Sequence, residues 1–133
     1  MTLVVDATVV VSALIDSGPE GAWASEQMAR GPLAAPHHMP VEVANVLRRA
    51  ALHGEVPGSI ASLALQDLLD VRFELFPFAP FARRAWALRG NFTPYDAWYV
   101  ALAESLDAPL ATLDDRLSRA PGCRCAFRCL GRD

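Results

Sequence analysis

The stretch TLVVDATVVVSALI (residues 2–15) joins two apolar segments through a single carboxylate. Residues 2–5 are short and apolar, as in a buried strand, and residues 7–15 favour a helix. Asp6 stands at the junction between them, where an aspartate can cap the amino terminus of a helix. The stretch therefore predicts a strand-to-helix unit, and it leaves open whether Asp6 does more than cap.

The rest of the chain repeats this alternation of strands and helices. Further strands are predicted at residues 33–36, 72–78 and 109–113 and in the Cys-rich tail. Further helices are predicted at residues 19–29, 39–54, 57–70, 79–90 and 93–104. Within residues 72–78, Phe73 and Leu75 fall on one side of the predicted strand, which favours a half-buried strand. The alternation predicts an α/β fold with a mainly parallel sheet, and the absence of repeats and linkers predicts one domain over residues 1–133.

The composition is typical of a globular protein, because 53% of the residues are apolar and 20% are charged. The apolar runs are shorter than the roughly 20 residues that span a bilayer. No secretion signal is visible, so we expect a cytoplasmic protein without membrane contact. All 12 basic residues are arginine, which excludes reactions that need a lysine, such as Schiff-base formation. A net charge of −3 argues against a positive coat for duplex DNA but is compatible with RNA binding.

Three cysteines, Cys123, Cys125 and Cys129, lie close together in the C-terminal tail. Alternate residues of a strand point the same way, so these thiols and Phe127 are expected to share one face of a final strand. Three thiols suggest zinc, but a tetrahedral site needs a fourth ligand and usually draws its ligands from paired turns. Buried cysteines are therefore favoured over a metal site, and the odd count argues against a disulfide framework.

Four acidic residues stand at junctions between predicted elements, and each has a structural explanation of its own. Asp6 and Asp114 can cap the helix or turn that follows them. Glu42 lies in a first helical turn, where the helix dipole favours an acid. Asp96 stands three residues after Thr93, as in a capping box. Capping and the helix dipole therefore account for each acid when it is considered alone.

Considered together, the four acids predict a metal site. Asp6 and Asp114 follow the carboxyl ends of predicted parallel strands, the edge at which open α/β sheets bind ligands. Glu42 and Asp96 lie in first helical turns that face the same edge. Four carboxylates in one place repel one another unless cations neutralise them, and ligation by oxygen alone suits Mg²⁺ or Mn²⁺. Such an ion can activate water and stabilise charge on a phosphodiester.

Three segments give the chain a resemblance to a known family: VVDATVVVSAL at the start, PVEVANVLRRA in the middle and TPYDAWYVALAESLDAPLATLDDRL near the end. In their order and spacing, the chain resembles a PIN-domain ribonuclease, specifically the toxin of a VapBC-type toxin–antitoxin pair. The resemblance implies a three-layer α/β/α PIN-like fold with a central, mainly parallel sheet of four to five strands. It also implies metal-dependent endonucleolytic cleavage of RNA, with tRNA or rRNA as the expected target and growth inhibition as the result.

The resemblance also implies roles for individual residues. The acidic quartet that is catalytic and binds Mg²⁺ or Mn²⁺ is matched by Asp6, Glu42, Asp96 and Asp114. Supporting positions beside this quartet are matched by Thr8, Asn45 and Thr112, with a solvated helix position as the alternative for Asn45. Arginines that could line the rim and contact RNA or antitoxin are Arg83, Arg84, Arg89, Arg116 and Arg119, with a solvated surface as the alternative. Asp115 is expected at the surface.

Partners follow from the same resemblance. It implies a cognate VapB-type antitoxin whose C-terminal segment lies across the site, often presenting an arginine to the acids. Toxins of this kind are typically homodimers within larger toxin–antitoxin complexes, which would account for the strongly apolar helix 57–70 and the stretch 73–82. We expect all three tryptophans, Trp23, Trp86 and Trp98, in the core rather than against an RNA base, because each lies at helical spacing.

Two other functions compete with this one. The first is a catalytically silent PIN-like domain that only binds RNA or a protein, which the presence of all four acids disfavours. The second is a small phosphatase or flavodoxin-like binder, which the absence of lysine and of a Gly-rich phosphate loop disfavours.

Overall fold

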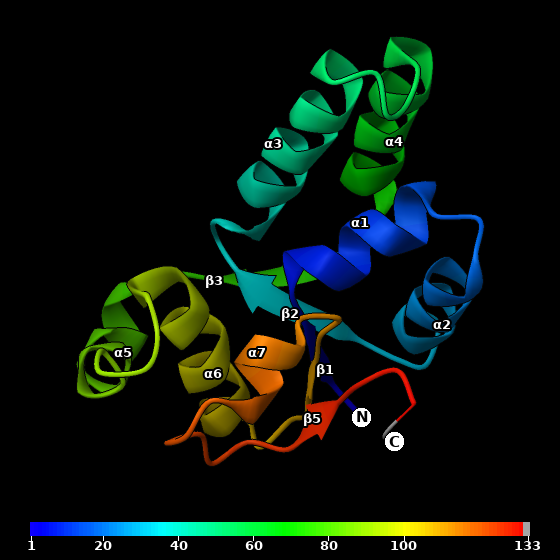
Figure 1. Ribbon diagram of the computed structural model, residues 1–133. Coiled ribbons are helices and arrows are strands. Elements are labelled where there is room, and N and C mark those ends of the chain that lie inside the picture. The colour runs from blue at the N-terminus through cyan, green and yellow to red at the C-terminus, as the bar shows by residue number, and fades with distance from the viewer. Residues whose placement is uncertain (132–133) are drawn as a thin grey trace.

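The computed structural model describes residues 1–131, in which five strands form one sheet between two layers of helices (Figure 1). The strand order is β3-β2-β1-β4-β5, and every pairing in these residues is parallel. The strands are β1 Leu3–Val5, β2 Leu33–Pro36, β3 Phe73–Phe76, β4 Leu110–Ala111 and β5 Phe127–Arg128. The expected three-layer α/β/α fold is confirmed, at the upper end of the expected number of strands.

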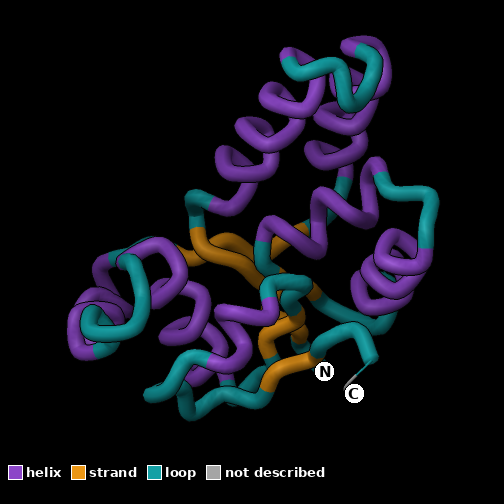
Figure 2. Tube along the Cα trace, viewed as in Figure 1, coloured by secondary structure: helices purple, strands orange, loops and turns teal. Residues whose placement is uncertain are grey.

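Helices join the strands and cover both faces of the sheet. They are α1 Ala7–Ile15, α2 Pro19–Met28, α3 Met39–Leu52, α4 Gly58–Asp70, the 3₁₀ turn η1 Ala79–Phe81, α5 Ala82–Ala87, α6 Pro94–Leu106 and α7 Asp115–Arg119. Figure 2 shows the strands gathered in the middle of the molecule, with α1 to α4 on one side and α5 and α6 on the other. Helices α3 and α4 form a hairpin that projects away from the sheet (Figure 1). Within residues 1–131, no helix has the length and apolar character needed to cross a membrane.

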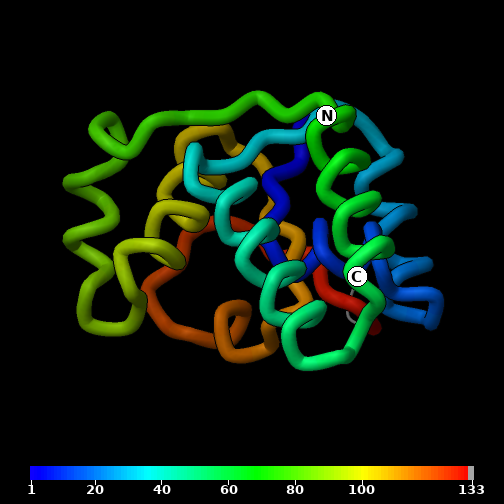
Figure 3. The backbone as a smooth tube through the Cα atoms, turned by 90° about the horizontal axis from the view of Figure 1, so that it is seen from above, coloured from blue at the N-terminus to red at the C-terminus, as the bar shows by residue number. Residues whose placement is uncertain are grey.

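Strand β1 is the centre of the fold, because it pairs with β2 on one side and with β4 on the other. Its register sets Val4 opposite Ala34 and Leu110, and all three side chains are fully buried. Figure 3 shows β1, in dark blue, running through the middle of the molecule beneath the α3–α4 hairpin. Helix α6 contacts β1 and β2 and buries Val100 completely. Since the strands are parallel, their carboxyl ends all lie at one edge of the sheet.

Strand β3 differs from its predicted pattern of burial. Leu75 is 38% exposed, whereas Phe73 and Phe76 are partly buried, so the prediction that Phe73 and Leu75 share a buried side is wrong. The reason is that β3 lies at the edge of the sheet, where one of its sides is open to solvent. Phe76 packs instead against Phe81, with 6.2 Å between the ring centroids.

The C-terminal tail also differs from expectation. Strand β5 is limited to Phe127–Arg128, so Cys123 and Cys125 precede it and the prediction of one thiol-bearing strand face is wrong. The physical reason is that the backbone bends at Cys125 and the backbone N–H of Arg124 donates to the Glu104 carboxylate instead of to a neighbouring strand. All three cysteines are free thiols, and Cys129 is buried as expected.

A partly buried ion pair ties this tail to the helical layer. Arg84 donates from Nε and Nη2 to the two carboxylate oxygens of Glu104, at 2.7 and 3.0 Å. The same carboxylate accepts the backbone N–H of Arg124 at 2.7 Å, and Arg84 also donates to the carbonyl oxygen of Gly122. Burial disfavours the charged carboxylate, yet its bonds to Arg84 and Arg124 outweigh burial and lower the pKa of Glu104. The pair therefore fixes the loop that precedes β5.

Replacing Glu104 with glutamine should destabilise the protein by about 2 kcal/mol. The variant loses the negative charge of the carboxylate that accepts two hydrogen bonds from Arg84 and one from the backbone N–H of Arg124. Glu26→Gln is the matched control. Glu26 pairs with Arg30 at 3.0 Å in a more exposed place, and its loss should cost less than about 0.5 kcal/mol. Urea unfolding followed by circular dichroism measures both variants. Equal losses would contradict the structural role of the Arg84–Glu104 pair.

Candidate active site

The four acids that the sequence singled out lie at the carboxyl edge of the sheet. Asp6 follows β1 directly and Asp114 follows β4, whereas Glu42 and Asp96 lie in the first turns of α3 and α6. Burial raises the pKa of Asp96, and the negative charges of Asp114 and Glu42 raise it further. The charge of Asp114 also acts on Asp6. The fold therefore brings four acids from distant parts of the chain into one electrostatic group.

Asp6 is the most deeply buried of these acids, with 5% of its surface exposed. Its carboxylate accepts hydrogen bonds from the hydroxyl of Thr8 at 2.5 Å, from the hydroxyl of Thr112, and from the backbone N–H of Val9 at 3.2 Å. Burial raises the pKa of Asp6 to about 6, because the loss of solvation outweighs these three bonds. Asp6 is thus the cap of α1 and also a carboxylate whose charged form is disfavoured.

The two threonines join the end of β1 to the end of β4. The Thr8 hydroxyl accepts the backbone N–H of Leu113 at 3.0 Å, and the Thr112 hydroxyl accepts the backbone N–H of Asp114 at 2.9 Å. Each hydroxyl has a single proton, which it donates to Asp6. The structure therefore places both threonines, which the sequence predicted as supporting residues, in direct contact with Asp6.

Glu42 is held by two residues that the sequence patterns did not single out. Its Oε1 atom accepts a hydrogen bond from the Tyr99 hydroxyl at 2.7 Å and lies 2.9 Å from Nε2 of His38. Burial acts to raise the pKa of Glu42, but the contacts with His38 and Tyr99 outweigh burial and lower it. A signal was present in the spacing: His38 lies four residues before Glu42, and Tyr99 lies three residues after Asp96, which are the spacings of neighbours on a helix.

Asp96 and Asp114 differ in how far capping explains them. Thr93 caps α6 by accepting the backbone N–H of Asp96 at 3.2 Å, and within residues 1–131 no hydrogen bond holds the Asp96 carboxylate. The Asp114 carboxylate does cap a helix, α7, which the sequence predicted only as a turn. Its Oδ1 atom accepts the backbone N–H groups of Arg116 at 3.0 Å and Leu117 at 3.3 Å. Capping therefore explains Asp114 but leaves the half-buried charge of Asp96 unexplained.

The acids do not form a closed metal cage, since within residues 1–131 no three His, Cys, Asp or Glu side chains converge closely enough to hold an ion. The chemistry of the donors nevertheless fits a hard divalent cation, because all four are carboxylates. Burial and neighbouring negative charge raise the pKa of Asp6 and of Asp96, and a cation would relieve both effects. The carboxylates would have to move closer together to surround an ion.

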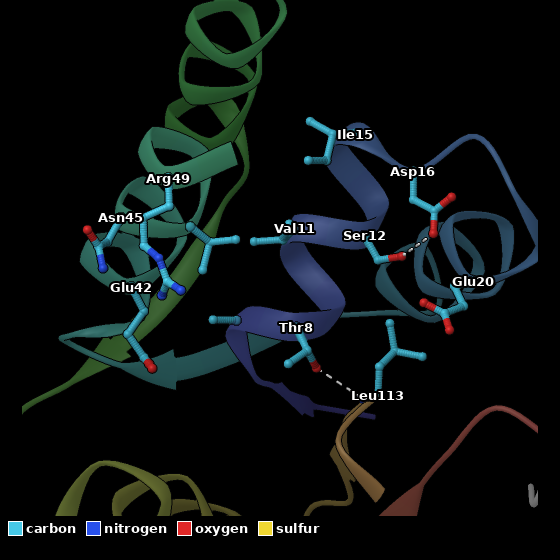
Figure 4. A pocket seen from close by; sticks show the side chains of 12 residues that line it. Thr8, Val11, Ser12, Ile15, Asp16, Glu20, Glu42, Asn45, Arg49 and Leu113 are labelled. Atoms are coloured by element: carbon cyan, nitrogen blue, oxygen red, sulfur yellow. Dashed lines mark hydrogen bonds between the residues drawn. The ribbon is translucent and has the colours of Figure 1, made fainter. Parts of the chain in front are cut away.

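A groove runs from the acids between α1 and α3 (Figure 4). It has a volume of about 640 Å³, with Glu42 on the α3 side, Thr8 in the middle, and Asp16 and Glu20 on the far side of α1. Asn45 lies in the same groove as Glu42 and is exposed, and its side-chain oxygen accepts a weak bond from Arg48 at 3.4 Å. A smaller cavity of about 100 Å³ contains Asp96 and Arg116. Two openings therefore lead to the acids.

The arginines predicted at the rim have different surroundings. The exposed ones are Arg83, Arg89, Arg116 and Arg119. Arg116 is closest to the acids: its side chain is 85% exposed and Nη2 lies 3.7 Å from Oδ2 of Asp114. Arg84 departs from the expectation, because its guanidinium is engaged by Glu104 and by the tail. Asp115, which was expected at the surface, is exposed.

Comparison with known proteins agrees with this fold. Residues 3–122 match the PIN domain family. The chain is 43% identical over 131 residues to Ribonuclease VapC1 of Mycobacterium tuberculosis, which covers 94% of this chain and 95% of that protein. PAE2754 from Pyrobaculum aerophilum superposes with a TM-score of 0.72 at 26% identity, covering 96% of this chain and 83% of the other. VapBC2 from Rickettsia felis, solved with a DNA fragment from its promoter, has a TM-score of 0.67 at 14% identity, covering 97% and 98%.

The five-stranded parallel sheet, with acids at its carboxyl edge, has the architecture of a PIN domain, and the family match covers most of the chain. Within that class, the chain belongs to the VapC family of VapBC toxin–antitoxin systems. The resemblance seen in its sequence is therefore confirmed.

Replacing Asp6 with asparagine should make the metal-free protein gain stability relative to wild type as the pH rises from about 4 to 6, by about 1–3 kcal/mol. Burial raises the pKa of Asp6 from 3.8 to about 6, so the folded state binds more protons than the unfolded state between these values. Wild-type stability therefore falls as the pH rises through this window and stays lower above it. This gain should be small near pH 4 and complete above pH 6.

Thermal unfolding in EDTA across this pH range measures the difference between the two proteins. Asp67→Asn, at an exposed acid on α4, is the control for the same change of side chain at the surface. A stability difference between Asp6→Asn and wild type that does not change with pH would contradict the raised pKa of Asp6.

Proposed function

We propose that this protein is a Mg²⁺- or Mn²⁺-dependent endoribonuclease toxin that cleaves tRNA or rRNA and is neutralised by a cognate VapB-type antitoxin. The observation that carries the proposal is the group of four carboxylates from four separate elements. Capping accounts for Asp6 and Asp114 but gives no reason for the half-buried charges of Glu42 and Asp96. The 43% identity to a protein named Ribonuclease VapC1 supports the same reaction.

The residues that would hold the cation are Asp6, Glu42, Asp96 and Asp114. A bound divalent cation supplies an activated water and stabilises the charge that develops on the phosphodiester. The chain contributes fixed orientation: Thr8 and Thr112 hold Asp6, and the Tyr99 hydroxyl holds Oε1 of Glu42. The contacts of Glu42 with Tyr99 and His38 are made by Oε1 and not by Oε2. Neighbours that hold a metal ligand in one orientation raise both metal affinity and activity.

The charge of the chain suits RNA once cations are bound. Its net charge of −3 includes the four carboxylates of the site, which divalent ions would offset. Arg116, exposed beside Asp114 and next to the cavity that contains Asp96, is then in place to contact a backbone phosphate.

The groove between α1 and α3 is the surface on which we expect the antitoxin's C-terminal segment. Its walls combine apolar side chains, Val11, Ile15 and Val46, with the carboxylate of Glu42 at one end (Figure 4). An amphipathic segment could therefore bury its apolar residues in the groove while it presents an arginine to the acids. Such an arginine would neutralise the site in place of metal and block access of RNA.

A homodimer through α4 is the second association that we expect. The helix buries Ala61, Ala64 and Leu68 against the protein and exposes large apolar side chains on both flanks of this buried stripe. These are Ile60 and Leu63 on one flank and Leu65 and Leu69 on the other. Large apolar side chains left exposed on a helix favour a protein contact. In the stretch 73–82, Leu75 adds to the exposed apolar surface.

Replacing Asp96 with asparagine should reduce cleavage of tRNA or rRNA at least about 100-fold, because the change removes a metal-binding charge and preserves the shape of the side chain. The Thr93 cap involves the backbone N–H of Asp96, so the helix start is retained. Purified protein, free of antitoxin, would be incubated with total tRNA and rRNA in Mg²⁺, Mn²⁺ or EDTA.

Asp115→Asn is the matched control, since it removes an exposed acid next to Asp114 and should leave the rate within about twofold. Cleavage that persists in EDTA, or a fully active Asp96→Asn protein, would contradict the metal site. A folded wild type that binds RNA and cuts none of it under any condition would favour the silent binding domain instead.

Replacing Tyr99 with phenylalanine should lower the cleavage rate by about 10- to 100-fold and raise the concentration of Mn²⁺ needed for half-maximal rate. The variant loses the hydroxyl that fixes Glu42 and keeps the buried ring. Tyr95→Phe, at an exposed tyrosine on the same helix, is the control and should behave as wild type. An unchanged Mn²⁺ requirement in Tyr99→Phe would rule out a positioning role for this hydroxyl.

A further inference from the structure

Trp86 departs from the expectation that the tryptophans lie in the core. It lies on α5 and is 66% exposed, whereas Trp23 and Trp98 are partly buried. Its surroundings hold it in a defined orientation: the Arg89 guanidinium lies 4.8 Å from the Trp86 ring centroid, and Nη1 of Arg89 donates to the Trp86 carbonyl oxygen at 3.0 Å. Arg89 covers part of the ring, and the exposed remainder is open to a ligand.

Beside Trp86 lies a cavity of about 390 Å³. Its lining residues are Phe78, Ala82, Ala85, Trp86, Arg89 and Pro94, and we call this surface the Trp86 shelf. The lining is apolar apart from the guanidinium, and it contains no acid. A shelf of this kind offers an aromatic face to a flat, uncharged group and a positive charge to whatever is attached to that group.

The shelf adjoins the helix turn that carries Asp96. Pro94 belongs to the shelf and stands two residues before Asp96 in the first turn of α6. The Phe78 ring meets Trp98 edge-on at 5.2 Å, and Trp98 stacks on His38 at 4.7 Å. His38 in turn lies 2.9 Å from Glu42. A row of aromatic rings therefore connects the shelf to one of the proposed metal-binding carboxylates.

An unpaired nucleobase is the ligand that this chemistry fits. Base stacking on exposed aromatic side chains, with arginine near the adjoining phosphate, is the usual way in which proteins hold single-stranded nucleic acid. An apolar protein segment could cover Trp86 as well, but it would leave the Arg89 charge without a partner. A nucleotide supplies both the ring and the negative charge, and the shelf adjoins the turn of α6 that carries Asp96, one of the proposed metal ligands.

We propose that the Trp86 shelf stacks one unpaired base of the RNA strand bound at the acids, and so selects single-stranded segments and sets which phosphodiester reaches the site. The proposal rests on the proposed ribonuclease function for its ligand, and RNA binding tests it without cleavage. Trp86 acts here as a specificity-determining residue rather than a catalytic one.

Binding of short fluorescent RNA to the full chain in EDTA is the first test. Trp86→Ala and Trp86→Leu should bind single-stranded RNA roughly 5- to 100-fold more weakly than wild type, while Trp86→Phe keeps most of the affinity. Leu52→Ala is the matched control, because Leu52 is an apolar side chain of similar exposure, 69%, at the end of α3. Binding of duplex RNA should be the same for wild type and all Trp86 variants.

Scanning a single abasic nucleotide along the RNA makes the test specific to one base. Wild type should lose affinity when the abasic nucleotide occupies one particular position, and Trp86→Ala should be indifferent at that position. This outcome supports the shelf even where wild type cuts no RNA, which separates it from the nuclease proposal. Full affinity in Trp86→Ala would overturn the shelf. A change of oligomeric mass in Trp86→Ala and Trp86→Leu, with RNA affinity intact, would identify a protein interface and overturn it too.

Discussion

The buried carboxylate of Asp6, with a threonine hydroxyl on each side, is the contact on which the arrangement of the site depends. It closes α1, and through Thr8 and Thr112 it fixes the turn after β4 that carries Asp114. Strands β1 and β4 can be short, because the threonine hydrogen bonds at their ends fix their positions in addition to the backbone hydrogen bonds between them. A carboxylate and two hydroxyls thus act as the joint between the first and fourth strands.

These contacts hold Asp6 where solvation is poor, so the fold contains a carboxylate whose charged form is disfavoured. Protein sites that bind cations commonly accept lower stability in exchange for function. The surrounding apolar core, with Val4, Val5 and Leu110 fully buried, supplies the stability that the acids do not. Glu42 differs from its neighbours because Tyr99 and His38 favour its charged form. One edge of the sheet therefore holds carboxylates with different tendencies to ionise.

The sequence was sufficient for elements with a strong apolar pattern and for the four acids at strand and helix ends. It was insufficient where distant contacts decide the outcome. Leu75 is exposed because β3 is an edge strand, and Trp86 is exposed because α5 turns Ala85, and not Trp86, toward the core. The role of Tyr99 required knowing that α6 faces α3 across the site. Arg84 could not be separated from the other arginines until its partner, Glu104, was known.

Helix α6 carries Asp96 in its first turn and Glu104 near its far end, so one rigid rod connects the active site to the C-terminal tail. At a rise of about 1.5 Å per residue, the two carboxylates are separated by roughly 12 Å of helix. The contacts of Glu104 with Arg84 and Arg124 therefore tie the far end of that helix to the loop that precedes β5. The last strand, only two residues long and at the edge of the sheet, is thus connected through α6 to a side chain of the proposed site. A change in the tail could then reach Asp96 along a single helix, because Glu104 and Asp96 lie on the same α6.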